Sequence, residues 1–273
     1  MSTVRELLQV DGIGSRGDAV AYEVTGEALR RYAAATDDQP GRTPAVFAIV
    51  PVWDAIAPAS RRVASDEARK RVVHASQDMV LHRPLEAGMK LVSTATPAAL
   101  LRRGSGTALV IHTETRTVGG ELVNEQWVTE FFRGVETAEN RGEPPAGHRL
   151  PDDARDSEPL AEISRRVAPD QPDRYAEASG DRFEIHLDDD AARAVGLPGR
   201  ILHGFCTLAF TAQAVSDAAE GGELRRLAAR FSAPVFPGDE LRTRVWDLGG
   251  GAYGFEAACD DRIVLRDGLA VLA

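Results

Sequence analysis

An acidic and a basic side chain stand close together in the segment of residues 175–205. Asp181 and His186 are five positions apart, and Gly180 is expected to end the helix that precedes them. Both side chains can therefore leave a bent segment toward one cleft. Histidine titrates near neutral pH, and a carboxylate beside it can orient it or share a water molecule with it. The pair is a candidate for general acid–base chemistry, although a solvated Asp and a structural His would show the same spacing.

A second candidate group is the backbone N–H of Gly204, which follows His203. Residues 204–219 are mostly apolar, and Leu208 and Val215 within them predict a buried helix. The N–H groups of a first helical turn have no partner inside the helix. Gly204 has no side chain to block approach, so its N–H is a candidate donor to a developing oxyanion.

Two similar halves are expected to position these groups. Residues 32–38 (YAAATDD) align with residues 175–181 (YAEASGD) at an offset of 143. Residues 84–91 align with residues 234–241 at an offset of 150. Two landmarks in the same order indicate duplication of a unit of roughly 130 residues.

The segment between the halves has the composition of a connector. It is rich in Pro, Gly and charge and has no apolar periodicity. We therefore expect an N-terminal unit at residues 1–133, a linker at 134–160 and a C-terminal unit at 161–273.

Each half combines helical segments with a run of strands. The expected strands are 71–81, 89–95, 107–118 and 121–133 in the first half and 227–235, 240–246, 252–259 and 263–272 in the second. Gly119-Gly120 stands at a hairpin position that needs positive φ. An antiparallel sheet against a buried helix, twice over, predicts an α+β fold class.

Composition excludes several classes of protein. The chain carries 32 Lys+Arg and 42 Asp+Glu, a formal net charge of −10, which disfavours nucleic acid as a partner. Cys206 and Cys259 have no partner pattern, and no cluster has metal-ligand spacing, so we expect neither a disulfide nor a metal. The longest apolar stretch, residues 45–53, is far shorter than the about 20 residues of a membrane span. The first residues do not resemble a secretory signal, so we expect a cytoplasmic protein.

A glycine pattern near the start of the chain is not expected to bind a dinucleotide. Residues 12–17 (GIGSRG) fit the pattern, but residues 18–24 alternate as a strand does. A dinucleotide site needs a helix at that point, because the helix N-terminus meets the pyrophosphate. We therefore expect no such cofactor.

The segment around Asp181 resembles the signature of the MaoC-like (R)-specific enoyl-thioester hydratases and dehydratases. That signature runs from an aromatic residue through Ser/Thr-Gly-Asp, Asn-Pro, an aliphatic residue and His to Gly-Arg-Ile-x-His-Gly. The matching residues are Tyr175, Ser179, Gly180, Asp181, Ile185, His186, Gly199, Arg200, Ile201, His203 and Gly204. Phe183-Glu184 replaces Asn-Pro, which predicts a loop of different shape, and we expect Glu184 to lie in solvent.

The resemblance implies a double hotdog, in which the first copy is degenerate and the second is active. It implies that Asp181 and His186 activate the water that adds to or leaves the β-carbon, and that Gly204 N–H holds the thioester oxygen. It also places His203 in substrate binding and requires no cofactor. The first copy has Asp38 opposite Asp181 but no counterpart of His186, so it cannot run the same chemistry.

The expected activity is that of a hydro-lyase on an enoyl or 3-hydroxyacyl thioester, carried by CoA or by an acyl carrier protein. Two alternatives stay open: a hotdog thioester hydrolase and a non-catalytic acyl-thioester-binding subunit. Phe47 and Trp53 stand where the second copy has its His-Gly turn, so they are candidates for lining an acyl channel. A homodimer is compatible with the sequence but not required, because two fused hotdogs already pair with each other.

Overall fold

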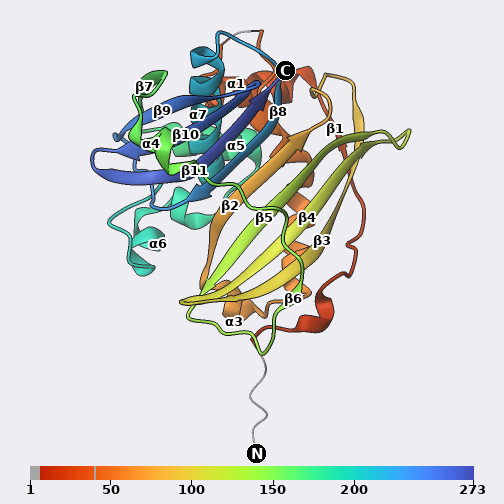
Figure 1. The fold of residues 1–273 in the computed structure, drawn as a ribbon. Helices are drawn as coiled ribbons and strands as arrows, with labels where there is room; N and C mark the ends of the chain where they lie inside the picture. Colours follow the sequence, from red (N-terminus) through yellow and green to blue (C-terminus); the bar gives the residue numbers. More distant parts are fainter. Residues whose placement is uncertain (1–6, 40) are drawn as a thin grey trace, which may run out of the picture. The chain divides into compact units, whose positions relative to one another are not determined.

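The computed structural model describes residues 7–39 and 41–273 (Figure 1). The first six residues of the stretch tested for a secretory signal lie outside the described part. Contacts divide the chain into two compact units. Unit 1 comprises residues 7–22, 51–79 and 90–147, and unit 2 comprises residues 23–39, 41–50, 80–89 and 148–273. Among the described residues, no helix combines the length and apolar character needed to cross a membrane.

Unit 1 is built on a sheet whose central strands are long and antiparallel. Its strand order is β1 (Val20–Glu23), β3 (Lys90–Arg103), β4 (Gly106–Thr117), β5 (Leu122–Arg133) and β2 (Val72–Leu81), and β6 (Arg141–Gly142) also pairs with β3. Its helical segments are η1 (Val10–Gly12), α2 (Trp53–Arg61) and α3 (Asp66–Arg69). The four strands predicted for the first half are confirmed, and Gly120 in the β4–β5 hairpin has a φ of 91°.

Unit 2 packs five strands against the long helix α7 (Gly204–Ala218). The strand order is β8 (Leu224–Phe231), β11 (Arg262–Leu272), β10 (Ala252–Cys259), β9 (Glu240–Gly249) and β7 (Ala161–Arg166), all antiparallel. Its other helical segments are α1 (Gly26–Ala35), η2 (Ala45–Val52, which ends in unit 1), α4 (Asp152–Asp156), α5 (Gln171–Ser179), η3 (Glu184–His186) and α6 (Asp189–Ala194). Figure 1 shows α7 behind the blue strands β9–β11. The buried helix and the α+β class are confirmed.

The ends of α1 and α5 support the predicted duplication. The hydroxyls of Thr36 and Ser179 each donate to the carbonyl four residues earlier, at 2.9 and 2.8 Å. The next residues, Asp37 and Gly180, both have left-handed backbone, with φ of 47° and 82°. Asp37 is one of few non-glycine residues with positive φ in the described chain. The two copies thus end their first helix in the same way.

Side chains from the second repeat cap the C-terminus of α1. Donors to its last carbonyls belong to Arg165, Gln171, Arg174 and Gln213, and the acceptors are the carbonyls of Ala34, Ala35, Thr36 and Asp37, at 2.6 to 3.3 Å. Arginine at a helix C-terminus also complements the negative end of the helix dipole. These bonds attach α1 to unit 2, although α1 belongs to the first repeat in sequence.

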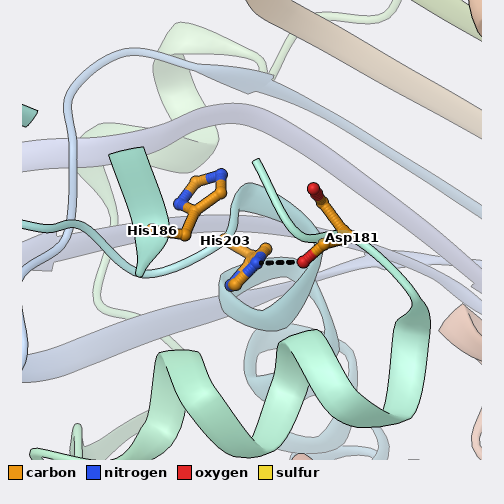
Figure 2. A group of neighbouring side chains, drawn as sticks. All are labelled: Asp181, His186 and His203. Atoms are coloured by element: carbon orange, nitrogen blue, oxygen red, sulfur yellow. Dashed lines mark hydrogen bonds between the residues drawn. The ribbon is translucent and has the colours of Figure 1, made fainter. Parts of the chain in front are cut away.

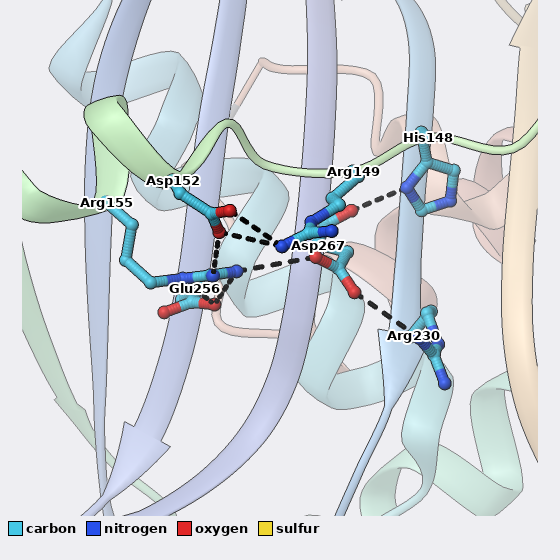
Figure 3. Close-up of polar contacts among 7 residues, drawn as sticks. All are labelled: His148, Arg149, Asp152, Arg155, Arg230, Glu256 and Asp267. Atoms are coloured by element: carbon cyan, nitrogen blue, oxygen red, sulfur yellow. Dashed lines mark hydrogen bonds and ion pairs between the residues drawn. The ribbon is translucent and has the colours of Figure 1, made fainter.

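The predicted linker is partly built into unit 2, as Figure 3 shows. His148 donates from Nδ1 to the carbonyl of Asp267, and Arg155 forms ion pairs with Glu256 and Asp267 at 2.9 and 3.4 Å. Leu150 beside them is 1% exposed. Within the predicted linker, His148, Leu150 and Arg155 thus contact unit 2, whereas Asp153 and Asp156 are exposed.

Candidate active site

A short irregular loop brings Asp181 and His186 together. Gly180 ends α5 in left-handed backbone, and the Asp181 carboxylate then accepts the N–H of Phe183 at 3.2 Å. The single turn η3 follows and ends at His186. Phe183 is 58% exposed, and Glu184 is also exposed, as predicted. The Phe183-Glu184 substitution therefore leaves a loop that turns Asp181 and His186 toward one another.

Hydrogen bonds fix the proton positions on two neighbouring histidines (Figure 2). His186 Nδ1 lies 2.9 Å from the carbonyl oxygen of Ile201. His203 Nε2 lies 3.0 Å from the carbonyl oxygen of Asp181. A carbonyl only accepts, so each of these nitrogens carries a hydrogen. In the neutral ring of His186 the other nitrogen, Nε2, is then an unprotonated base.

The three side chains form a buried cluster. Asp181, His186 and His203 are 8%, 9% and 1% exposed, and one nitrogen or carboxylate oxygen from each lies within 4.8 Å of the others. The two imidazoles stack with ring centroids 3.9 Å apart and planes 25° apart. A metal ion bound by both rings would lie in both planes at about 2 Å from each nitrogen. Nearly parallel, stacked rings cannot offer that arrangement, so the geometry does not fit a shared metal ion.

Burial shifts the proton affinities of the cluster. It raises the pKa of Asp181 and lowers the pKa of His186, and the attraction between the two groups opposes both shifts. Burial, together with the neighbouring His186, lowers the pKa of His203 to about 3. His186 is therefore neutral at neutral pH, next to a carboxyl group with increased proton affinity. Such perturbed pairs in a partly accessible site are typical of acid–base chemistry.

Gly204 lies where the sequence predicts it, as the first residue of α7. Its N–H has no acceptor among the residues that the structure describes. A Cβ atom at this position would meet the ring of Phe231 at 3.0 Å. The site therefore has an unpaired N–H at a helix N-terminus, and the close aromatic ring favours glycine there.

The predicted channel residues lie in different surroundings. Phe47 has no exposed surface, and its ring packs edge-on against Tyr32 with centroids 5.4 Å apart. Tyr32 and Tyr175 meet through their hydroxyls at 3.1 Å, and Tyr175 packs on His203 at 4.8 Å. Phe47 and His203 each contact one tyrosine of this pair, Phe47 edge-on at 87° and His203 tilted at 44°. Trp53 is half-buried at the start of α2.

Sequence reasoning did not find two groups that shape the site. The carbonyl of Ile201 orients His186, but a backbone acceptor has no side-chain signature. The tyrosine pair at positions 32 and 175 marked the repeat, yet nothing in its spacing predicted contact between the two hydroxyls.

Three arginines of unit 2, at positions 165, 225 and 230, have partners within that unit. Arg165 binds the end of α1 and lies over Phe210, 4.8 Å from the ring centroid. Arg225 donates to the carbonyl of His82, and Arg230 pairs with Asp267 at 3.5 Å. These three side chains therefore have structural roles in unit 2.

Solved structures define the class of fold. The chain is similar to a MaoC-like dehydratase from Phytophthora capsici, with a TM-score of 0.84 and 22% identity over 97% of this chain and 99% of that one. It is also similar to a Mycobacterium tuberculosis protein described as having a double hotdog fold, with a TM-score of 0.62 and 14% identity over 94% and 96% of the two chains. The fold is a double hotdog, as the resemblance implied.

Sequence comparisons define the family. A model of the MaoC like domain matches residues 152–259, and a model of the MFE-2 hydratase 2 N-terminal domain matches residues 30–134. The chain is 35% identical to 3-hydroxyacyl-thioester dehydratase Y of Mycobacterium tuberculosis over 211 residues, 72% of this chain and 71% of the relative. It is 30% identical to peroxisomal enoyl-CoA hydratase 2 of Arabidopsis thaliana over 185 residues, 64% and 60% of the two chains. The protein belongs to the MaoC-like dehydratase family.

Proposed function

We propose that this protein is a hydro-lyase that interconverts a trans-2-enoyl thioester and its (R)-3-hydroxyacyl thioester. One observation carries the proposal: a buried carboxylate, Asp181, lies in one cluster with His186, whose Nδ1 is bound to the carbonyl of Ile201 so that Nε2 is left as the base. The names of the two relatives, a 3-hydroxyacyl-thioester dehydratase and an enoyl-CoA hydratase, support the same reaction class.

In the hydration direction, a water molecule binds between the Asp181 carboxylate and His186 Nε2. The pair removes a proton from the water as its oxygen bonds to the β-carbon. Negative charge then develops on the thioester oxygen, where the unpaired N–H of Gly204 and the N-terminal dipole of α7 stabilise it. The proton held by the pair returns to the α-carbon, which completes addition of one water across the double bond. Dehydration is the reverse.

The substrate of the proposal is an acyl thioester, and CoA or an acyl carrier protein carries it. We propose that Trp53 and Phe47 influence the length of acyl chain that is accepted.

The proposed organisation of the chain is a degenerate repeat at residues 1–133, a linker at 134–160 and a catalytic repeat at 161–273. A homodimer is the proposed assembly, and its test is the oligomeric state in solution. A cytoplasmic location is also part of the proposal: Cys206 and Cys259 are free and buried, as in reducing compartments, whereas the Arabidopsis relative is named as peroxisomal.

One assay separates this function from its alternatives. The protein is incubated with crotonyl-CoA, and the enoyl absorbance and the free thiol are followed together. A hydro-lyase removes the absorbance without releasing thiol, a thioester hydrolase releases thiol, and a binding subunit does neither. Coupling the product to a dehydrogenase specific for (R)- or (S)-3-hydroxyacyl thioesters then reads the stereochemistry.

A further inference from the structure

His203 is placed to hold other groups rather than to react. It is 1% exposed, and its Nε2–H donates a hydrogen bond to the carbonyl of Asp181. Its Nδ1 is buried without a hydrogen-bond partner in the described chain. The ring contacts Tyr175 at 4.8 Å and stacks on His186 at 3.9 Å, so with 1% of the residue exposed it offers almost no surface to a substrate.

Both members of the catalytic pair contact this ring. The hydrogen bond fixes the backbone of Asp181, from which the carboxylate extends, and the stacked ring limits where His186 can turn. His186 is further held from its other side by the carbonyl of Ile201. A shift of about 1 Å in a catalytic group is enough to lower a rate about a hundredfold, so a contact that fixes both groups matters for turnover.

The first repeat supplies an internal comparison. There Phe47 contacts Tyr32, edge-on at 5.4 Å, and in the second repeat His203 contacts Tyr175, tilted at 4.8 Å, so each repeat has an aromatic contact to its tyrosine. Phenylalanine has no N–H to donate, and the first repeat has no counterpart of His186 to support. Among the rings that contact these two tyrosines, the imidazole is therefore in the repeat that holds an acid–base pair, and a phenyl ring is sufficient for packing in the other.

We propose that His203 is a positioning residue, which holds Asp181 through its Nε2–H bond and His186 through ring stacking, and that it does not contact substrate. The proposal rests on the hydro-lyase function and replaces the substrate-binding role expected from the sequence. It predicts a loss in kcat with KM unchanged, because the ring is enclosed by protein.

The test compares two variants on the full chain with crotonyl-CoA. His203→Phe copies the first repeat and keeps an aromatic ring but no donor, and we expect kcat to fall about a hundredfold. His203→Gln places an amide N–H near the position of Nε2, and we expect it to recover most of kcat. Val215→Ala, a fully buried change farther along α7, is the matched control for core damage and should keep the wild-type kcat.

Nitrogen-15 NMR of the histidine rings gives a readout that does not depend on turnover. In the wild-type protein at pH 7 we expect the proton on Nε2 of His203 and on Nδ1 of His186. His203→Phe should shift the ring nitrogens of His186, and Val215→Ala should not.

The outcomes are distinct. A wild-type protein that is inactive on enoyl thioesters would contradict the hydro-lyase function. The NMR result would still support or overturn the positioning role of His203. A proton on Nδ1 of His203, a folded His203→Phe variant with wild-type kcat, or a His203→Gln variant as impaired as His203→Phe would each overturn the proposal.

Discussion

Replacing His186 by Asn removes the proposed base and leaves the local structure nearly intact. The amide nitrogen of Asn can occupy the place of imidazole Nδ1, so the bond to the Ile201 carbonyl is kept. What is lost is Nε2, the nitrogen that we propose acts with the Asp181 carboxylate, together with the stacking on His203. The substitution therefore separates acid–base chemistry from the fold of the loop.

The expected loss follows from the role of the deleted nitrogen. Removal of a positioned proton-transfer group costs about 10² to 10⁴ in rate, which corresponds to about 3 to 5 kcal/mol of transition-state stabilisation. Asp181→Asn should lose a similar factor, because an amide cannot take up the proton. The double variant should be little worse than either single variant, since both residues act on the same water.

The assay is the initial rate of crotonyl-CoA hydration as a function of pH. Burial lowers the pKa of His186, so in the wild-type protein this base should stay unprotonated until the pH falls below its ordinary value of about 6.5. The His186→Asn variant should lose this acid limb from its remaining kcat/KM. A folded variant that keeps more than about a tenth of the wild-type rate would refute the base assignment.

Three further predictions concern the surroundings of the pair. Gly204→Pro should lower kcat about 10²- to 10³-fold relative to Gly204→Ala. Both side chains crowd the Phe231 ring, but only Pro removes the N–H. The ratio of the two kcat values therefore measures the contribution of the N–H donor. Burial lowers the pKa of His203 to about 3 in the folded protein, so its contribution to the folding free energy is present above about pH 6.5 and is lost as the pH falls toward 3. In urea unfolding, the free energy of unfolding should decrease between pH 7 and pH 5 in the wild-type protein. This decrease should be about 2 kcal/mol smaller in His203→Gln. Trp53→Ala and Phe47→Ala should each change the ratio of kcat/KM for long against short enoyl thioesters, and Phe47→Ala should in addition destabilise the protein by about 3 to 5 kcal/mol, because Phe47 is fully buried. An unchanged ratio across a chain-length series would contradict the channel role.

Local patterns in the sequence predict most of the strands, and they fail where a pattern is interrupted. Pro97 has no N–H, so the predicted strand stops at residue 95. In the structure Pro97 lies at a register irregularity between β3 and β4, and the strand continues to Arg103. β7 was missed because it is a short edge strand in which charged residues leave only a weak apolar pattern.

The active pair could be predicted because its chemistry requires particular residue types at a particular spacing. Gly180 and the short loop then bring Asp181 and His186 together within six residues. The role of His203 could not be predicted, because it depends on contacts with Tyr175 and the Asp181 carbonyl that join distant parts of the chain. Nor could the Phe183-Glu184 departure be judged: Phe183 supplies the N–H that binds Asp181, and any residue except proline has one.

The capping of α1 by the second repeat changes which substitutions natural selection can tolerate. Residues 26–37 correspond to a helix of the active repeat. Their backbone carbonyls accept hydrogen bonds from Arg165, Arg174 and two buried glutamines of that repeat. A substitution in α1 therefore also affects hydrogen bonds made by α5, the helix that leads into the loop of Asp181 and His186. The two repeats therefore depend on one another at this helix, although only the second holds both Asp181 and His186.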